Sequence, residues 1–407
     1  MGMTEPRHQS EARMSRFIGE PLAGVAVLPP GLEEEGAAEL KALGATSVQV
    51  LRRAVAFRTD LEGFYRLQLQ ARLPFRILRE LARFSCDGPR QLYEAVAGAA
   101  DWDQWLPPSR SFRVDVSGSL PGLAHSHFTA LQVKNALVDG QRQRWGERSS
   151  IDLNDPELCL HLHLGQAPGG RGGVGVLSVD GAGGSLHRRG WRAAVGLAPL
   201  KENLASGLIA LTGWDGSVPL ADPLCGSGTL LIEAACRQLG RVPGLDPLGG
   251  VPRPQLLRHW PDFQGTLWER EVRSAQALSA APPALAPIMG LERDADVLVQ
   301  ARANSVSAGV AEHVQLQQGD CRDFQPPNGP GVIVCNPPYG ARLGGGEDLE
   351  GLYADLGAML KQRCSGWSLW LLSGNPELTG ALRMKARRRI PVSNGGIDCR
   401  WLNYEIR

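Results

Sequence analysis

The tetrapeptide Asn336-Pro337-Pro338-Tyr339 carries groups that could hold a planar, amine-bearing molecule. The amide oxygen of Asn336 and the carbonyl of Pro337 can each accept one N–H from an amino group, and the ring of Tyr339 can stack against a base. We therefore treat Asn336, Pro337, Pro338 and Tyr339 as candidate catalytic residues. A proline-rich turn that only closes a strand could contain the same four residues. The neighbouring sequence must therefore distinguish a ligand site from a structural turn.

The apolar run before this tetrapeptide, residues 331–335, predicts a buried strand. Two successive prolines exclude both a helix and further strand pairing, so the chain must turn at the carboxyl end of that strand. Open α/β sheets bind their ligands at this edge. The tetrapeptide therefore stands where a ligand site is expected.

A second candidate site lies at residues 218–234, which predict a short strand, a glycine turn and a helix. This is the opening unit of a nucleotide-binding type of fold. The turn has neither the GxGxxG pattern nor the lysine of a phosphate loop, which favours a ligand without a pyrophosphate. S-adenosylmethionine fits, because Asp222 can pair with its ammonium group. The residues expected to bind the cofactor here are Asp222, Cys225, Gly226, Gly228 and Thr229.

Two further predicted strands end in carboxylates. Residues 286–292 end at Glu292, which could accept hydrogen bonds from both ribose hydroxyls, with Asp294 as the alternative. Residues 314–320 end at Asp320, which could accept from the adenine amino group. Four strand ends in chain order, each with a polar group, are more specific than any one alone. Together they predict a single site for a cofactor and an amine.

Length and composition limit the class of protein. A chain of 407 residues exceeds one core, so two or three domains are expected, and a net charge of +1 leaves no polycationic arm. Eight cysteines without a CxxC pair predict reduced thiols in a cytoplasmic protein. No stretch is apolar enough for a signal peptide or a membrane span, so neither secretion nor membrane insertion is expected.

Two histidine pairs have a spacing that could suit metal ligands. His161 with His163, and His125 with His127, could each share the face of a strand. No third ligand lies near either pair in the sequence, and leucines on the other face already explain the alternation at 158–164. No metal site is expected.

The N-terminal half predicts an α+β organisation in two units, 17–70 and 71–165. The expected strands cover 24–28, 48–57, 111–116 and 158–164, and the expected helices cover 30–43 and 129–138. Arg72, Arg76, Arg79 and Arg83 recur at helical spacing, which predicts a basic helix face turned toward either phosphates or solvent. A glycine-rich stretch at 165–185, with a strand at 174–179, marks the expected domain boundary.

Beyond this boundary, residues 186–192 combine basic and aromatic side chains. Arg188, Arg189 and Arg192 are candidate contacts for an RNA backbone, and a packed linker with solvated arginines is the alternative. The segment 237–287 is long for a link between the first two strands and predicts either an ordered lid or a surface excursion. Strands at 367–372, 389–392 and 399–406 bring the number from Val218 onward to seven.

A resemblance to a known module lies between Phe112 and Leu164. The runs His127-Phe128-Thr129-Ala130-Leu131-Gln132-Val133-Lys134 and Leu160-His161-Leu162-His163-Leu164 resemble a THUMP domain, the RNA-binding module of several tRNA and rRNA modification enzymes. The resemblance implies a ferredoxin-like partner, which suits 17–70, and a grip on structured RNA near a 3′ end.

The four strand ends resemble class I methyltransferases of the amino-methylating group that carry Asn-Pro-Pro-Tyr. The stretches 186–192, 198–202 and 222–233 are similar to the THUMP-linked rRNA guanine-N2 methyltransferases. This implies a Rossmann-like methyltransferase domain with a seven-stranded mixed sheet at 186–407. It also implies S-adenosylmethionine bound by the strand-end residues already named, with the target base held at 336–339. Many class I enzymes have Asp where this chain has Glu292.

The expected fold is therefore α/β, with an α+β ferredoxin-like and THUMP region before the methyltransferase domain. The expected function is methylation of an exocyclic base amine in structured RNA, with guanine N2 of 23S rRNA as the target that the resemblance implies. The alternatives are a tRNA guanine-N2, DNA adenine-N6 or protein glutamine methyltransferase, or an RNA-binding protein without activity. The sequence leaves the oligomeric state open.

Overall fold

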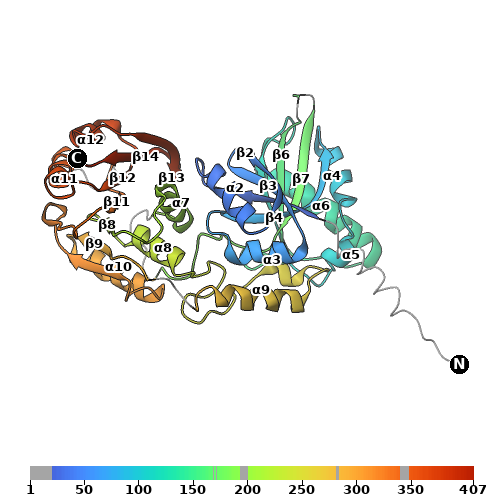
Figure 1. The fold of residues 1–407 in the computed structure, drawn as a ribbon. Helices are drawn as coiled ribbons and strands as arrows, with labels where there is room; N and C mark the ends of the chain where they lie inside the picture. The colour runs from blue at the N-terminus through green and yellow to red at the C-terminus, as the bar shows by residue number, and fades with distance from the viewer. Residues whose placement is uncertain (1–20, 168, 171, 193–199, 281–283, 340–347) are drawn as a thin grey trace.

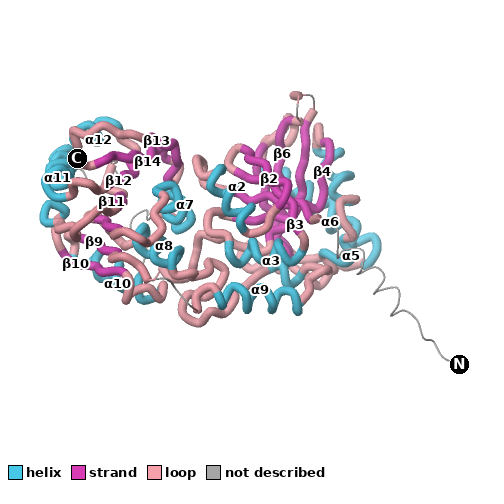
Figure 2. The backbone as a smooth tube through the Cα atoms, in the orientation of Figure 1, coloured by secondary structure: helices cyan, strands magenta, loops and turns pink. Residues whose placement is uncertain are grey.

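The computed structural model describes residues 21–407, apart from 168, 171, 193–199, 281–283 and 340–347. The chain forms two lobes side by side, each built on a seven-stranded sheet (Figure 1). Figure 2 shows the strands gathered at the centre of each lobe with helices around them. None of the helices in these ranges is long and apolar enough to cross a bilayer.

The first sheet has the order β2-β3-β1-β4-β7-β6-β5. Its strands are β1 (Leu22–Val27), β2 (Thr46–Leu51), β3 (Ala54–Thr59), β4 (Arg76–Ser85), β5 (Phe112–Gly118), β6 (Leu158–Gln166) and β7 (Gly173–Asp180). Its helices are α2 (Glu33–Ala42), α3 (Leu61–Gln70), α4 (Pro89–Ala97), α5 (Trp102–Trp105) and α6 (Ser126–Trp145). Only β5 and β6 run parallel, and the other neighbours are antiparallel.

The predicted basic helix at 72–83 is wrong, because residues from Arg76 onward form the central strand β4, paired with β1 and β7, and Arg72 precedes it. Side chains alternate along a strand, so the arginines do not form one face. Arg76 pairs with Asp180 at 2.6 Å. Arg79 pairs with Asp262 at 2.7 Å and lies over the ring of Trp105. The two neighbouring strands provide backbone partners that outweigh the local helical spacing.

The glycine-rich stretch at 165–185 is more than a connector. Its predicted strand is present as β7, which pairs with β4 on one side and β6 on the other and so lies inside the first sheet. The ferredoxin-like and THUMP parts therefore share one continuous sheet. The limits 17–70, 71–165 and 186–407 stay a prediction. The expected strand at 48–57 is a hairpin of β2 and β3.

The second sheet has the order β10-β9-β8-β11-β12-β14-β13, and the seven predicted strands are confirmed. They are β8 (Leu220–Asp222), β9 (Ile288–Glu292), β10 (Val314–Gln318), β11 (Val332–Cys335), β12 (Ser368–Ser373), β13 (Arg388–Asn394) and β14 (Ile397–Glu405). β8 to β12 are parallel, whereas β14 is antiparallel to both β12 and β13. The strand order reverses direction between β8 and β11, which is the position where such sheets hold ligands.

Helices cover both faces of this sheet. They are α7 (Glu202–Thr212), α8 (Thr229–Gln238), α10 (Ala295–Ser307), α11 (Leu349–Arg363) and α12 (Pro376–Ala381), with the short 3₁₀ helix η2 (Cys321–Asp323). Alternate strand residues belong to different cores: Val334 packs with α7, α8 and α10, whereas Ile333 and Cys335 pack with α11. The strands are therefore buried on both sides and rigidly fix the residues at their ends.

The segment 237–287 contains ordered structure and is not an inert surface excursion. It carries η1 (Leu256–His259) and α9 (Gly265–Ala277), and α9 lies along α3 of the first lobe (Figure 1). The Trp268 ring meets that of Tyr65 edge-on at 5.5 Å, and the Glu271 carboxylate accepts from Arg66 at 2.8 Å. The segment therefore fastens the second lobe to the first.

Candidate active site

Asn336 follows β11 directly, at the carboxyl edge of the second sheet. Its side-chain oxygen is buried and accepts no hydrogen bond from the described part of the chain. The next turn is held from behind, because the buried Tyr353 of α11 donates its hydroxyl to the carbonyl of Pro338 at 3.3 Å. A buried acceptor without a donor is costly unless a ligand supplies one.

Tyr339 is held by the C-terminal strands. Its hydroxyl accepts from the Asn394 side chain at 2.7 Å, and the thiol of Cys399 lies 3.6 Å away. The ring also lies against Gly374, where an added Cβ would come within 3.2 Å of it. These contacts fix the ring at the end of β12 and beside the β13–β14 hairpin.

Asp222 ends β8 and is 2% exposed. Its side chain accepts from the backbone N–H of Leu224 at 3.0 Å. Burial, with the charge of Glu292 nearby, raises the pKa of the Asp222 carboxyl to about 8. A cationic group brought next to this carboxyl would favour its ionised form.

The glycine turn after β8 depends on two residues with left-handed backbone, Gly226 at φ +52° and Gly228 at φ +80°. The N–H of Gly226 donates to Glu292 at 3.0 Å, and the other oxygen of Glu292 accepts from the N–H of Asp294 at 2.9 Å. Asp294 is engaged elsewhere, since its carboxylate caps α10. Glu292 is therefore bound to the turn, while the alternative Asp294 is a helix cap.

Asp320 lies at the end of β10 and caps η2. Its two oxygens accept from the Arg322 side chain at 2.8 and 2.9 Å. This hydrogen bonding by Arg322 lowers the pKa of Asp320 to about 2. The carboxylate is fixed and ionised. Its Oδ1 also accepts from the backbone N–H of Arg322 at 2.9 Å, so a further donor would bond to Oδ2.

The strand register brings these predicted residues to one edge. Asp222 is paired with Gly290 of β9, and Glu292 with Gln318 of β10, so their strands end side by side. β11 is the neighbour of β8 on the other side. Asp222 and Asn336 therefore flank the point where the strand order reverses, with Glu292 and Asp320 one and two strands further along.

The predicted RNA patch at 186–192 requires a correction, because two of its three arginines do not face solvent. The Arg189 side chain is 4% exposed, donates to the backbone carbonyls of Leu186 and Arg72, and lies 3.6 Å from Glu233. Arg192 is 12% exposed and pairs with Glu202 at 2.8 Å. Only Arg188 is exposed. Carboxylate and carbonyl groups of the protein itself bind Arg189 and Arg192, where the sequence suggested RNA phosphates.

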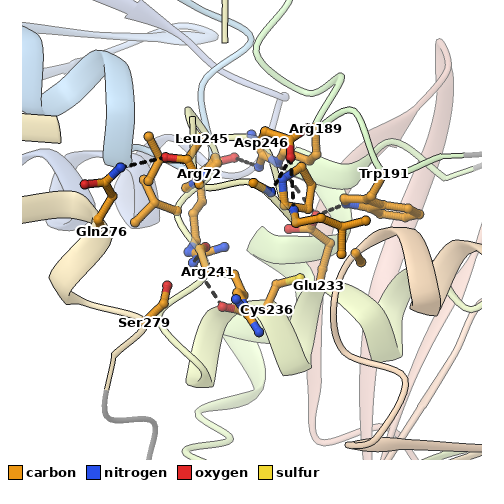
Figure 3. A pocket seen from close by; sticks show the side chains of 17 residues that line it. Arg72, Arg189, Trp191, Glu233, Cys236, Arg241, Leu245, Asp246, Gln276 and Ser279 are labelled. Atoms are coloured by element: carbon orange, nitrogen blue, oxygen red, sulfur yellow. Dashed lines mark hydrogen bonds and ion pairs between the residues drawn. The ribbon is translucent and has the colours of Figure 1, made fainter. Parts of the chain in front are cut away.

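Arg189 lines a cavity of about 320 Å³ at the junction of the two lobes (Figure 3). Its walls include Arg72 from the first lobe, Trp191 from the connector and Glu233 from α8. Trp191 donates its indole N–H to Glu233 at 3.4 Å, and Arg72 donates to the carbonyls of Cys236 and Arg241. These contacts join the lobes.

Three supporting residues were missed by sequence reasoning: Tyr353, Arg322 and Asn394. Arg322 stands two residues from Asp320, so spacing alone could have suggested that pair. Asn394 and Tyr353 lie 55 and 15 residues from their partners, and no local pattern indicates them. Within the described ranges, no three His, Cys, Asp or Glu side chains gather as a metal site, and all eight cysteines are free and buried.

The sheet order, the reversal point and the polar strand ends define the second lobe as a class I methyltransferase domain, the fold of S-adenosylmethionine-dependent methyltransferases. Family models agree. Residues 189–403 match the RMKL-like methyltransferase domain, 90–167 the THUMP domain and 24–78 the RlmL ferredoxin-like domain. The chain belongs to the RMKL-like methyltransferase family, and the resemblance to THUMP-linked methyltransferases is confirmed.

Similar proteins cover most of the chain. A Synechocystis sp. protein with the provisional name RNA methyltransferase is 40% identical over 94% of this chain and 96% of its own length. The ribosomal RNA large subunit methyltransferase K/L of Syntrophotalea carbinolica is 38% identical over 95% of this chain. This chain spans only 54% of that relative.

Two solved structures have the same fold over nearly the whole chain. The provisionally named methyltransferase SMU.472, complexed with SAH, aligns with a TM-score of 0.82 at 26% identity, over 96% of this chain and 99% of the other. A Listeria monocytogenes protein, titled a predicted N6-adenine-specific DNA methylase, aligns with a TM-score of 0.80 at 26% identity over 98% of both chains.

Proposed function

We propose that this protein transfers a methyl group from S-adenosylmethionine to an exocyclic amine of a base in structured RNA, with guanine N2 of 23S rRNA as the target. The observation that carries this proposal is the buried side-chain oxygen of Asn336, which has no donor in the described chain. An amino group placed at the reversal point of the sheet would supply that donor. A base amine is flat enough to enter beside two prolines.

The cofactor fits the residues on the other side of the reversal point. Asp222 would pair with the ammonium group, and Glu292 keeps lone pairs for the ribose hydroxyls. Asp320 would accept from the adenine amine. Cys225, Gly226, Gly228 and Thr229 would form the turn around the amino-acid part, where Gly226 has open space at the position of a Cβ.

When bound, the cofactor supplies an electrophilic methyl group. The residues of the chain position the amine: Asn336 and the carbonyl of Pro337 would accept its two N–H bonds, so that the nitrogen lone pair leaves conjugation and points away from them. Tyr339 would support the base. No strong general base is required, because the amine proton becomes acidic as the new bond forms. Position is the main contribution of this site.

RNA as the substrate is supported by the THUMP match and by the names of the K/L relatives. Of the three arginines first considered, Arg188 remains a candidate phosphate contact. Exposed basic residues before and within β13 could add to it, namely Arg383, Lys385, Arg388 and Arg389. A cytoplasmic location agrees with this substrate. The choice of guanine N2 over adenine N6, and of 23S rRNA over tRNA, rests on the family.

The test compares the wild-type chain with Asn336→Ala and a matched control, Asn328→Ala, which removes an exposed amide from the loop before β11. Each protein is incubated with methyl-labelled cofactor and 23S rRNA, tRNA or DNA, and the modified nucleoside is identified by mass spectrometry. The expected product is N2-methylguanine in 23S rRNA. Asn336→Ala should lower the rate by about 10²-fold or more, while the affinities for cofactor and RNA stay nearly unchanged.

Methylated adenine in DNA, or a labelled protein glutamine, would replace this proposal with one of the alternatives. No label in any substrate would support an inactive RNA-binding protein. If Asn336→Ala lost RNA binding and not rate, the role of its amide oxygen would be wrong.

A further inference from the structure

Arg192, which the sequence suggests as an RNA contact, is largely buried. Its side chain is 12% exposed, and its guanidinium group lies over the ring of the preceding Trp191, 5.0 Å from the ring centre. It donates from Nε to the carboxylate of Glu202 at 2.8 Å. It also donates from one terminal nitrogen to the carbonyl of Leu200 at 3.1 Å. A phosphate would have to displace a buried carboxylate to reach it.

The same guanidinium group contacts the glycine turn. Its terminal nitrogens lie 3.2 Å from the hydroxyl of Thr229 and 3.5 Å from that of Ser227, the residues on either side of Gly228. Thr229 is the first residue of α8, whereas Glu202 is the first residue of α7. One planar side chain therefore joins the starts of two helices through four acceptors, a geometry that Arg provides and Lys does not.

The glycine turn needs such support. Gly226 and Gly228 both have left-handed backbone, and glycine moves between conformations more freely than other residues. The hydroxyls of Ser227 and Thr229 lie 3.3 Å apart, so Arg192 contacts two neighbouring hydroxyls of the turn. Asn304 of α10 donates to the carbonyl of Ser227 at 3.1 Å and so also fixes the turn. Arg192 and Asn304 therefore both hold the turn, Arg192 through its hydroxyls and Asn304 through a backbone carbonyl.

We propose that Arg192 is a positioning residue for the cofactor: it holds the turn at Ser227–Thr229 in the shape that receives the amino-acid part of S-adenosylmethionine. This inference rests on the proposed function, since it assumes that this turn binds the cofactor. It reassigns Arg192 from RNA contact to cofactor support. Arg188, four residues earlier and exposed, is the neighbour that faces solvent.

The experiment uses the full chain and measures two affinities. Calorimetry gives the affinity for SAH, and filter binding at several salt concentrations gives the affinity for 23S rRNA. Arg192→Lys keeps the charge but cannot reach four acceptors, so SAH affinity should fall about tenfold or more, while RNA affinity and its salt dependence stay within about twofold. The matched control, Arg188→Gln, should leave SAH affinity unchanged and reduce the salt slope of RNA binding by about one.

A second variant covers the case in which Arg192→Lys does not fold. Glu202→Gln acts from α7, removes the charge that anchors Arg192, and should also weaken SAH binding, by about threefold or more. Where both variants fold, the double variant should weaken SAH binding by less than the sum of the two single effects, because both substitutions act through the same guanidinium group. A purely structural role would lower thermal stability without this coupling in ligand affinity.

The outcomes separate the inference from the proposed function. If the wild-type chain binds neither SAH nor S-adenosylmethionine, the proposed function fails and the inference fails with it. If the wild type binds SAH and Arg192→Lys or Glu202→Gln binds it equally well, only the inference is overturned. A loss of RNA affinity with a lower salt slope in Arg192→Lys would restore the RNA-contact interpretation.

Discussion

The buried carboxyl of Asp222 predicts that cofactor affinity depends on pH. Its pKa is raised to about 8, chiefly by burial and further by the charge of Glu292. The proposed ion pair requires an ionised Asp222 and a protonated amine on the cofactor. The perturbation is therefore a change of pH between 6 and 9, with Asp222→Asn as the variant that removes the titrating group.

The size of the pH effect on SAH affinity follows from the titration of the Asp222 carboxyl and of the cofactor amine. A carboxyl with a pKa of about 8 is ionised to about 1% at pH 6 and about 9% at pH 7, and a free α-amino group has a pKa of about 7.8. The product of the two competent fractions rises about eightfold from pH 6 to pH 7 and peaks near pH 8. SAH affinity should follow this curve. Asp222→Asn should bind more weakly at pH 8, by about 1.5–3 kcal/mol, and should lose the rise below pH 7.

Calorimetry in buffers with different heats of ionisation is the assay, because it also counts protons. At pH 7 the wild type should release about 0.8 proton on binding, while the variant should release none. The folded-state pKa lies above the ordinary value of 3.8, so ionisation of Asp222 lowers folding stability as pH rises from about 4 to about 8. Asp222→Asn should abolish that loss. A wild-type affinity that is flat from pH 6 to pH 8, with no proton release, would refute the assignment of Asp222.

Three further predictions concern the residues and segments that support the candidate site. Trp268→Ala should destabilise the protein by about 3–5 kcal/mol in denaturant unfolding, because Trp268 is buried against the first lobe, while Leu278→Ala, at an exposed position of the same segment, should change stability by less than about 0.5 kcal/mol; equal effects would show that α9 does not dock on α3. A fragment that begins at Gly173 should also be poorly folded. It contains β7 without the strands that pair with it, and it lacks α3, which covers α9. Tyr339→Phe and Asn394→Ala should each lower kcat by about three- to tenfold through loss of their hydrogen bond, and the double variant should be no slower than the worse single one. Additive losses in single-turnover rates would indicate that Asn394 acts independently of Tyr339.

Sequence reasoning succeeded where a local pattern has one physical outcome. Two prolines after an apolar run force a turn at a strand end, and two glycines between a strand and a helix allow the left-handed backbone that the structure shows at Gly226 and Gly228. Parallel strands then bring their carboxyl ends to one edge. The order of polar strand ends from Asp222 to Asn336 was therefore enough to predict the sheet and the edge at which these candidate residues gather.

The sequence by itself thus determined which strands end in polar groups, and the tertiary structure decided which charged side chains are free. Arg76 and Arg79 have helical spacing, yet their segment is a strand because β1 and β7 lie on either side of it. The sequence suggests that Arg189 and Arg192 are surface cations, yet both are largely buried and paired with Glu233 and Glu202 respectively. Burial depends on which distant segment arrives next to a side chain, and neither spacing nor composition carries that information.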